Sequence, residues 1–168
     1  MRIHVTGCRG FLGAYIRRAL ESDHELEVSD VDDLDVTDLD ATVAGLAGEV
    51  DAVCHLAGLT GAQASVRSPE RYFRVNATGT LNVLEACRRN RIRRLVFLST
   101  LTVHGASDAP VAEDSPMVPR HPYAASKAAA EMMLATYARS FGIASATLRA
   151  TLIAGEGQAE ANAVSDFV

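Results

Sequence analysis

The sequence contains no tryptophan, and its 168 residues include only three cysteines. Cys8, Cys54 and Cys87 are odd in number and show no paired spacing, which argues against a disulfide framework and for free thiols. Neither C-x-x-C nor H-x-x-x-H occurs and the five histidines are scattered, so no metal ligation is expected. Small disulfide-rich domains and zinc-held domains are thereby excluded.

The chain also lacks an excess of positive charge and a long apolar run. Its formal net charge is -5 and its pI about 5.5, so a bulk electrostatic attraction to nucleic acid or to an acidic membrane is not expected. No apolar stretch is long enough to span a bilayer, and the first residues lead straight into a strand without a signal-peptide pattern. With the free thiols, these absences favour a cytoplasmic protein that binds neither nucleic acid nor a membrane.

Apolar residues make up 48% of the sequence, which is enough for one domain with a packed core. Apolar patterns of strand and of helix period alternate along the whole chain. We predict strands around residues 3–5, 26–28, 50–57, 95–98 and 143–149, helices over 11–20, 39–47, 69–90 and from 122 onward, and a loop over 104–122. This alternation predicts an α/β fold with a doubly wound parallel sheet and right-handed crossovers.

Three glycines, Gly7, Gly10 and Gly13, separate the first strand from the first helix in the spacing G-x-x-G-x-x-G. Glycines let the backbone turn tightly and come close to a pyrophosphate, and the start of the helix offers free N–H groups and a positive dipole end. The stretch therefore predicts a phosphate-binding cradle, with a plain tight turn as the alternative.

Two charged residues near this loop bear on the type of dinucleotide. Asp30 ends the second strand, where a carboxylate can accept hydrogen bonds from the adenosine ribose hydroxyls. The alternative is a turn aspartate, because further aspartates follow closely at positions 32, 33, 35 and 38. Arg9 lies in the loop itself, where a guanidinium can bind a 2′-phosphate. Asp30 thus favours NAD, whereas Arg9 leaves NADP open.

Small or polar residues follow the predicted inner strands, at the edge where open α/β sheets bind ligands. Gly58 ends the apolar run 50–57, and Thr100 follows the run 95–98 among other hydroxyl residues. His55 lies inside its apolar run, and we interpret it as a core histidine with satisfied hydrogen bonds rather than a catalytic group. Asn76, within the helix predicted over 69–90, has either a surface position or a buried hydrogen-bonding role.

Tyr123 and Lys127 are four residues apart, which places both side chains on one face of the last helix. An ammonium close to a phenol favours the phenolate, so we expect Lys127 to lower the pKa of Tyr123 below its usual value of about 10. Tyr123 can then act as base or acid on a substrate oxygen that Thr100 also binds, while Lys127 holds the nicotinamide ribose. The alternative for such a pair is surface packing.

Six short segments follow one another along the chain in a specific order. They are T-G-C-R-G-F-L-G at 6–13, D-V-T-D at 35–38, H-L-A-G at 55–58, V-N-A-T-G-T at 75–80, S-T-L-T-V-H-G at 99–105 and Y-A-A-S-K at 123–127. In this order they resemble the extended short-chain dehydrogenases/reductases of the NAD-dependent epimerase/dehydratase family. The resemblance spans nearly the whole chain and implies a Rossmann-type NAD(P)-binding domain.

The resemblance implies an NAD cofactor, with NADP as the alternative, and a small, sugar-like substrate, typically a nucleotide-activated sugar. It implies that Tyr123 is the acid/base group, Lys127 its modulator and Thr100 the residue in the family's Ser/Thr position. The residues expected to bind the cofactor are Gly7, Gly10, Phe11, Leu12, Asp30, Asp35, Val36, Leu56, Ala57, Gly58, Asn76, Tyr123 and Lys127. The substrate would be oxidised to a 4-keto intermediate or reduced from one, and a homodimer is compatible with this assignment.

The chain departs from the family pattern in three ways. His104 replaces the tyrosine usual in V-Y-G, and Leu152 stands where the family often has an asparagine that contacts the substrate. The chain is also considerably shorter than family members, whose second half supplies further strands and a small substrate domain. We therefore expect residues 1–168 to form the NAD(P)-binding domain, with the substrate domain truncated or minimal.

The short length keeps two alternatives to an oxidoreductase or epimerase open. One is a non-catalytic dinucleotide-binding module, such as a sensor or the pseudoenzyme partner of an active subunit. The other is a truncated chain that folds only as an oligomer.

Overall fold

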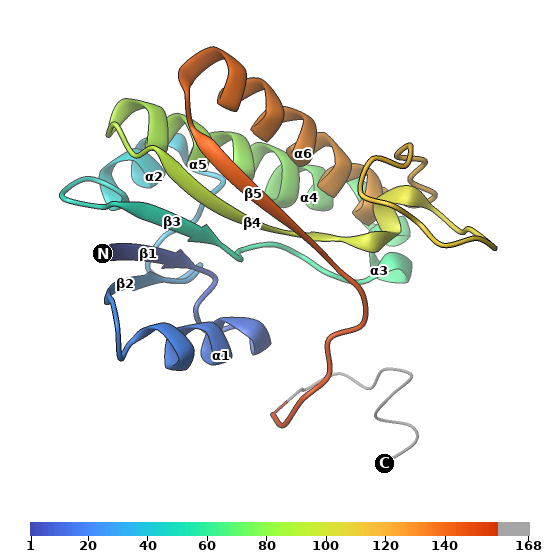
Figure 1. Cartoon of the computed structure of the whole chain (residues 1–168), viewed down its shortest axis with the longest axis horizontal. Helices are drawn as coiled ribbons and strands as arrows, with labels where there is room; N and C mark the ends of the chain where they lie inside the picture. The colour runs from blue at the N-terminus through green and yellow to red at the C-terminus, as the bar shows by residue number, and fades with distance from the viewer. Residues whose placement is uncertain (158–168) are drawn as a thin grey trace.

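The computed structural model describes residues 1–157 and contains a five-stranded sheet (Figure 1). The strands are β1 (Arg2–Thr6), β2 (Glu25–Ser29), β3 (Ala52–His55), β4 (Arg94–Thr100) and β5 (Ala144–Ala150). Their order is β2-β1-β3-β4-β5, and every neighbouring pair is parallel. Parallel neighbours need crossover connections, which helices supply here. The predicted α/β fold with a parallel, Rossmann-type sheet is confirmed.

The crossovers place helices on both faces of the sheet (Figure 1). The helical segments are α1 (Phe11–Leu20), α2 (Leu39–Gly45), α3 (Ala62–Arg67), α4 (Pro69–Tyr72), η1 (Phe73–Thr78), α5 (Gly79–Arg89), η2 (Leu101–His104) and α6 (Pro122–Phe141). Helices α2, α5 and α6 lie side by side on one face, whereas α1 lies on the other. Within residues 1–157, no helix has the length and apolar character that a membrane crossing needs.

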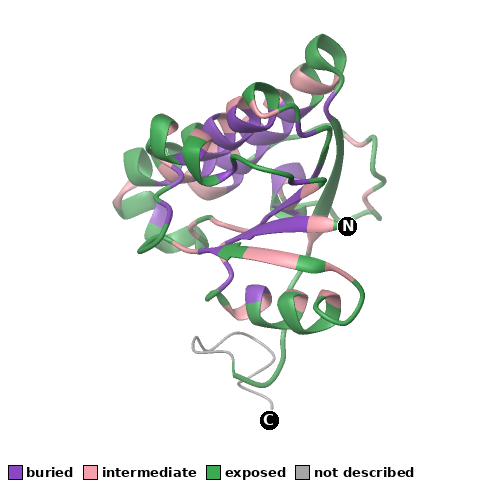
Figure 2. Cartoon of the chain, turned by 90° about the vertical axis from the view of Figure 1, so that its left-hand side faces the viewer, coloured by how far each residue is buried: buried purple, intermediate pink, exposed green. Residues whose placement is uncertain are grey.

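Two separate cores pack against the two faces of the sheet. The larger core lies under α2, α5 and α6, and Leu84, Phe97 and Leu134 are among its buried side chains. The smaller core lies under α1 and includes Val5 and Cys54. Figure 2 shows the difference, because buried residues line the sheet side of the three-helix layer, whereas α1 is mostly exposed or half-buried.

Local sequence signals set both ends of α6, the helix that carries the predicted catalytic pair. His121 is the N-cap, and its side chain accepts a backbone N–H of the first turn. Pro122 follows, at a position where a missing N–H leaves no hydrogen bond unmade. Gly142 ends the helix in the left-handed conformation, with φ of 66°. Tyr123 and Lys127 therefore lie in the first turns of a helix with well-defined ends.

The elements differ from the sequence predictions in a few places. The helix predicted over 69–90 is interrupted by the π-helical segment η1, and the short helix α3 occupies residues that carried no prediction. β3 is shorter than the apolar run 50–57, whereas β4 continues through Ser99 and Thr100, so that these hydroxyls belong to the strand. His104, expected to open a loop, ends the 3-10 helix η2. Apolar periodicity missed these features because six-residue helices and single π-turns contain too few repeats to show a period.

Candidate functional site

The turn between β1 and α1 is so tight that two of its glycines have no room for a side chain. Gly7 has φ of 74°, and a Cβ atom there would lie 2.6 Å from the backbone nitrogen of Ala57. A Cβ atom at Gly13 would lie 2.3 Å from the carbonyl oxygen of Gly7. The turn is anchored to the end of β2, because the N–H groups of Gly7 and Cys8 donate to the carbonyl oxygen of Ser29 at 2.8 and 3.2 Å.

The first turn of α1 presents backbone donors beside this turn. Its N-cap, Gly10, supplies no side-chain cap, and the following residues Phe11 and Leu12 are part of a first turn without acidic residues. The first N–H groups of a helix have no partner within the helix, and the helix dipole makes this end positive. A Cβ atom at Gly10 would lie 3.3 Å from the carbonyl oxygen of Gly7, a tight approach that favours glycine at this position as well. This cradle fits an anionic diphosphate.

Asp30 and Arg9 meet beside the cradle. One carboxylate oxygen of Asp30 accepts the backbone N–H of Arg9 and the other accepts that of Val31, each at 2.8 Å. The guanidinium of Arg9 pairs with the carboxylates of Asp32 and Asp33, at 2.7 and 2.8 Å. Asp30 and Arg9, on which we expect the choice between NAD and NADP to depend, thus belong to one hydrogen-bonded cluster.

Asp35 and Val36 lie in the turn that leads from β2 to α2. Asp35 is exposed, and its carboxylate accepts the N–H of Thr37 at 2.9 Å. Val36 is 5% exposed and belongs to the larger core, where its carbonyl oxygen accepts a side-chain N–H of Asn82 at 2.9 Å. The side chain of Val36 therefore has a packing role. Cofactor binding by either residue stays a prediction.

Leu56, Ala57 and Gly58 follow β3 and lie next to the glycine loop. The N–H groups of Leu56 and Ala57 donate to the carbonyl and hydroxyl oxygens of the last residue of β1, at 3.2 and 3.3 Å. A Cβ atom at Gly58 would lie 3.0 Å from Oδ1 of Asn76 and 3.2 Å from Nζ of Lys127. The missing side chain at Gly58 thus brings the end of β3 against the lysine predicted to hold the nicotinamide ribose.

His55 is completely buried within β3. Its ring nitrogens lie 2.7 Å from the hydroxyl of Thr6 and 3.1 Å from the hydroxyl of Thr80. Burial, helped by the charge of Lys127, lowers the pKa of His55 to about 3. The ring is therefore neutral at physiological pH, and the prediction of a core histidine with satisfied hydrogen bonds is confirmed.

Asn76 is completely buried in η1 and joins two segments of the site. Its Oδ1 accepts the N–H of Leu59 at 2.8 Å, and its Nδ2 donates to the carbonyl oxygen of Leu59 and to the hydroxyl of Ser126, both at 3.0 Å. Ser126 in turn donates to the carbonyl oxygen of Tyr123 at 2.8 Å. The predicted buried hydrogen-bonding role is confirmed: the amide holds the segment after β3 against α6. Direct binding of a cofactor by Asn76 stays a prediction.

Thr100 and Tyr123 come together at the carboxyl end of β4. Burial raises the pKa of Tyr123, a hydrogen bond with Thr100 opposes this, and the neighbouring Tyr72 raises the pKa further. The phenol ring stacks on the ring of His121, with centroids 5.9 Å apart, and meets Tyr72 edge-on at 6.3 Å. The expectation that Lys127 lowers this pKa is wrong, because desolvation of the phenolate is the dominant effect.

Lys127 is 4% exposed and points toward β4. Its Nζ donates to the carbonyl oxygen of Leu98 at 2.8 Å and lies 4.6 Å from the centre of the Phe97 ring. Burial lowers the pKa of Lys127 to about 8, and Glu131 partly opposes this shift. The ammonium is therefore charged at neutral pH, although it titrates far closer to neutrality than a surface lysine.

A buried polar network lies behind these residues and carried no sequence prediction. Glu131 on α6 accepts the hydroxyl of Ser99 and forms a two-point ion pair with Arg149, at 2.7 and 3.0 Å. Arg149 also donates to Nε2 of His104 at 3.0 Å, and Nδ1 of His104 bonds to the carbonyl oxygen of Pro116 at 3.1 Å. Two sequence signals were available: the single acidic residue within the alanine-rich α6 and the single charged residue of the last strand.

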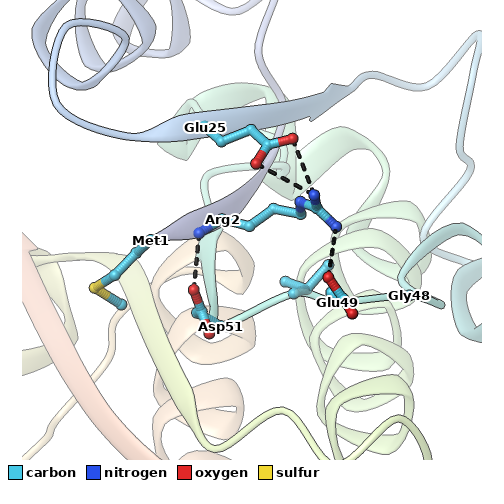
Figure 3. A pocket seen from close by; sticks show the side chains of 7 residues that line it. Met1, Arg2, Glu25, Gly48, Glu49 and Asp51 are labelled. Carbon is cyan, nitrogen blue, oxygen red and sulfur yellow. Dashed lines mark hydrogen bonds and ion pairs between the residues drawn. The ribbon is translucent and has the colours of Figure 1, made fainter.

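A hollow of about 550 Å³ lies at the opposite, amino-terminal edge of the sheet, away from every predicted site residue (Figure 3). Its lining consists of Met1, Arg2, Glu25, Gly48, Glu49, Val50 and Asp51. The guanidinium of Arg2 pairs with Glu25 at 3.1 Å and with Glu49 at 3.6 Å, and its backbone N–H donates to Asp51 at 2.8 Å. Exposed ion pairs of this kind contribute little individually, and we interpret them as fastening the first residues of neighbouring strands.

The sequence of the whole chain resembles those of known proteins. A model of the NAD dependent epimerase/dehydratase family matches residues 3–168. The UDP-glucose 4-epimerase of Azospirillum brasilense is 35% identical over 173 residues, which cover 92% of this chain and 49% of that relative. The expected resemblance is therefore confirmed by sequence comparison over nearly the whole chain.

Solved structures support the same conclusion. The UDP-glucose 4-epimerase of Thermus thermophilus in complex with NAD superposes with a TM-score of 0.81 and 32% identity, covering 89% of this chain and 54% of that one. RMD from Pseudomonas aeruginosa, complexed with NADPH, gives a TM-score of 0.80 and 30% identity, covering 89% and 52%. The chain thus spans about half the length of the relatives it matches. By sequence and by fold, this chain belongs to the NAD-dependent epimerase/dehydratase family.

Proposed function

We propose that the chain is the cofactor-binding and catalytic part of an NAD(P)-dependent oxidoreductase or epimerase acting on a hydroxyl or keto carbon of a nucleotide-activated sugar. The observation that carries the proposal is the grouping of Thr100, Tyr123 and Lys127 at one edge of the sheet, next to Gly58 and the glycine loop. Family membership supports it, because relatives include UDP-glucose 4-epimerases.

Tyr123 is the acid/base group in this proposal. Because burial raises its pKa, the phenol keeps its proton at neutral pH and can donate it to a substrate oxygen. The hydroxyl of Thr100, which interacts with the phenol, can bind the same oxygen and hold it in line. In the oxidative direction Tyr123 must accept a proton instead, and the interaction with Thr100 favours the phenolate that this requires, against the effect of burial.

The remaining residues hold the dinucleotide. Backbone N–H groups of the first turn of α1 would bind the diphosphate, and Asp30 would accept hydrogen bonds from the adenosine ribose. Lys127, against which the absence of a side chain at Gly58 brings the segment after β3, would donate to the nicotinamide ribose. The nicotinamide ring, when bound, supplies the hydride acceptor and donor that no side chain of the chain offers.

The test is turnover of UDP-glucose by the chain in the presence of NAD, with sugar products separated by chromatography. Tyr123→Phe removes only the phenolic hydroxyl, and we expect turnover to fall about 100-fold or more while the affinity for NAD stays within about threefold. Tyr137→Phe is the matched control, because the same atom is removed from the same helix, where it bonds to Glu85 at 2.7 Å outside the site. Full activity of the Tyr123→Phe variant would contradict the acid/base role proposed for Tyr123.

A non-catalytic dinucleotide-binding module is the second candidate. It is favoured by Leu152, which is 50% exposed and stands where the family often has a substrate-binding asparagine. Calorimetric binding of NAD without turnover of any nucleotide sugar would support this candidate over the enzyme.

A further inference from the structure

Arg9 ties the glycine loop to the turn after β2 through three carboxylates. Its guanidinium is shared between Asp32 and Asp33, at 2.7 and 2.8 Å, and each of these contacts uses a different terminal nitrogen. Its backbone N–H donates to Asp30 at 2.8 Å. The side chain and the main chain of Arg9 thus bind the same short acidic segment, which follows directly on the strand end where an adenosine ribose is expected.

We infer that Asp32 and Asp33 make this site selective for NAD by holding Arg9 away from the position of a 2′-phosphate. The inference rests on the dinucleotide role proposed for the glycine loop. It concerns residues beyond the expected Asp30, and it assigns to Arg9 a role opposite to the one its position in the loop suggests. In this assignment Arg9 is a positioning residue that fixes the shape of the ribose site.

The charges of the cluster support this selectivity. Two carboxylates pair with the guanidinium of Arg9 and a third, Asp30, accepts its backbone N–H, so the cluster is net negative and repels an added phosphate dianion. To bind the phosphate, Arg9 would have to leave both aspartates and bring the new charge next to them. The ribose of NAD carries a hydroxyl at this position, and a hydroxyl donates to a carboxylate without electrostatic cost.

Asp30 retains the acceptor capacity that this ribose needs. A carboxylate has about four lone-pair sites, and each oxygen of Asp30 accepts one backbone N–H, from Arg9 and from Val31. One site on each oxygen therefore stays open to a ribose hydroxyl. Because two N–H groups already fix the carboxylate plane, Asp30 is oriented before the ribose arrives.

The experiment measures calorimetric affinities of the chain for NAD and NADP at one low ionic strength. For the unchanged chain we expect NAD to bind at least about tenfold more tightly than NADP. In the double variant Asp32→Ala, Asp33→Ala the guanidinium is released and two negative charges are lost, so the affinity for NADP should rise about tenfold. The affinity for NAD should change by less than about threefold, because Asp30 is untouched.

Two further variants distinguish the release of Arg9 from a general effect of surface charge on NADP affinity. Glu21→Ala, Asp23→Ala removes the same charge from the exposed turn between α1 and β2, and it should leave the ratio of the two affinities unchanged. Arg9→Gln in the released background should abolish the gain in NADP affinity, whereas Arg9→Gln alone should not weaken NADP binding. Circular dichroism of each variant verifies that the fold is retained.

Several outcomes would overturn the inference. One is equal or tighter binding of NADP by the unchanged chain, and another is loss of NADP affinity in Arg9→Gln alone, since Arg9 would then already reach the phosphate. Both leave the chemistry proposed for Tyr123 intact. Binding of neither dinucleotide would overturn the inference and the proposed function together.

Discussion

The two faces of the sheet are built very differently. On one face three helices cover a continuous core in which Leu84, Phe97 and Leu134 are almost fully buried. On the other face α1 is the one helix that residues 1–157 place over the strands, and its small core reaches across the sheet only as far as β3. Ser145, Thr147 and Arg149 line a groove with α6, so the alternate residues of β5, Leu148 among them, point to the thinly covered face, where Leu148 is 53% exposed.

This difference matters for the site, because each face contributes a different part of it. The thinly covered face carries the glycine loop and α1, whose backbone groups form the proposed phosphate cradle. The deeply packed face carries the buried side chains of Asn76 and Lys127 and the half-buried Tyr123, and burial shifts the pKa values of Tyr123 and Lys127. The side chains of the candidate site thus lie on the tightly packed face. Its backbone groups lie on the other face, where the glycine turn defines the geometry.

Equal truncations on the two faces should cost unequal amounts of stability. Leu84→Ala in α5 leaves a cavity in the larger core and should reduce the free energy of unfolding by about 3 kcal/mol or more. Leu20→Ala in α1 removes a half-buried side chain and should cost about 1 kcal/mol. Urea unfolding followed by circular dichroism measures both. Similar losses would contradict the contrast between the two cores.

Acidification should reduce the free energy of unfolding, because His55 is buried as a neutral ring beside the larger core. The unfolded chain binds a proton at His55 below its ordinary pKa of 6.5, whereas burial keeps the folded chain from binding it until about pH 3. The unfolded state therefore binds more protons in this window, and stability falls as the pH falls. Between pH 6.5 and about pH 5 the loss from His55 should be roughly 1.5 kcal/mol.

His55→Gln is the matched variant for this measurement. Its amide can bond to both Thr6 and Thr80 but does not titrate, so the dependence of unfolding free energy on pH should become shallower below pH 6.5. Urea unfolding at a series of pH values measures the slope. An unchanged slope would mean that His55 is not the group responsible.

The smallest effect is expected on the thinly covered face. Leu148→Ser replaces a side chain that is 53% exposed, and the free energy of unfolding should change by no more than about 0.5 kcal/mol. Thermal unfolding at two protein concentrations measures this. A loss of about 2 kcal/mol that depends on concentration would show that a second chain covers this face in solution.

The parts of the molecule that depend on local sequence were predictable. The spacing of Gly7, Gly10 and Gly13 identified the turn that has no room for side chains, and apolar periodicity gave α1 its observed bounds. Tyr123 and Lys127 were placed correctly on one helix because their spacing alone decides the helix face. These features require knowledge of neighbours in sequence only.

The features that depend on neighbours in space were not predictable. The pKa of Tyr123 was expected to fall, yet it rises, because burial depends on what covers the ring and the covering Tyr72 lies on a distant segment. The bonds of Asn76 to Leu59 and Ser126, and the two-point ion pair of Glu131 and Arg149, join residues many positions apart. Only the packing of α6 against η1 and β5 brings these partners together.

The two edge strands of the sheet respond differently to an incoming strand. An edge strand presents unpaired N–H and C=O groups, and charged side chains discourage further pairing there. β2 carries Glu25 and Glu27 at one edge, whereas β5, two residues longer, has Arg149 as its only charge, and Glu131 neutralises it. Over residues 1–157, β5 pairs with β4 alone. The sheet can therefore be extended by strand addition far more readily beside β5 than beside β2.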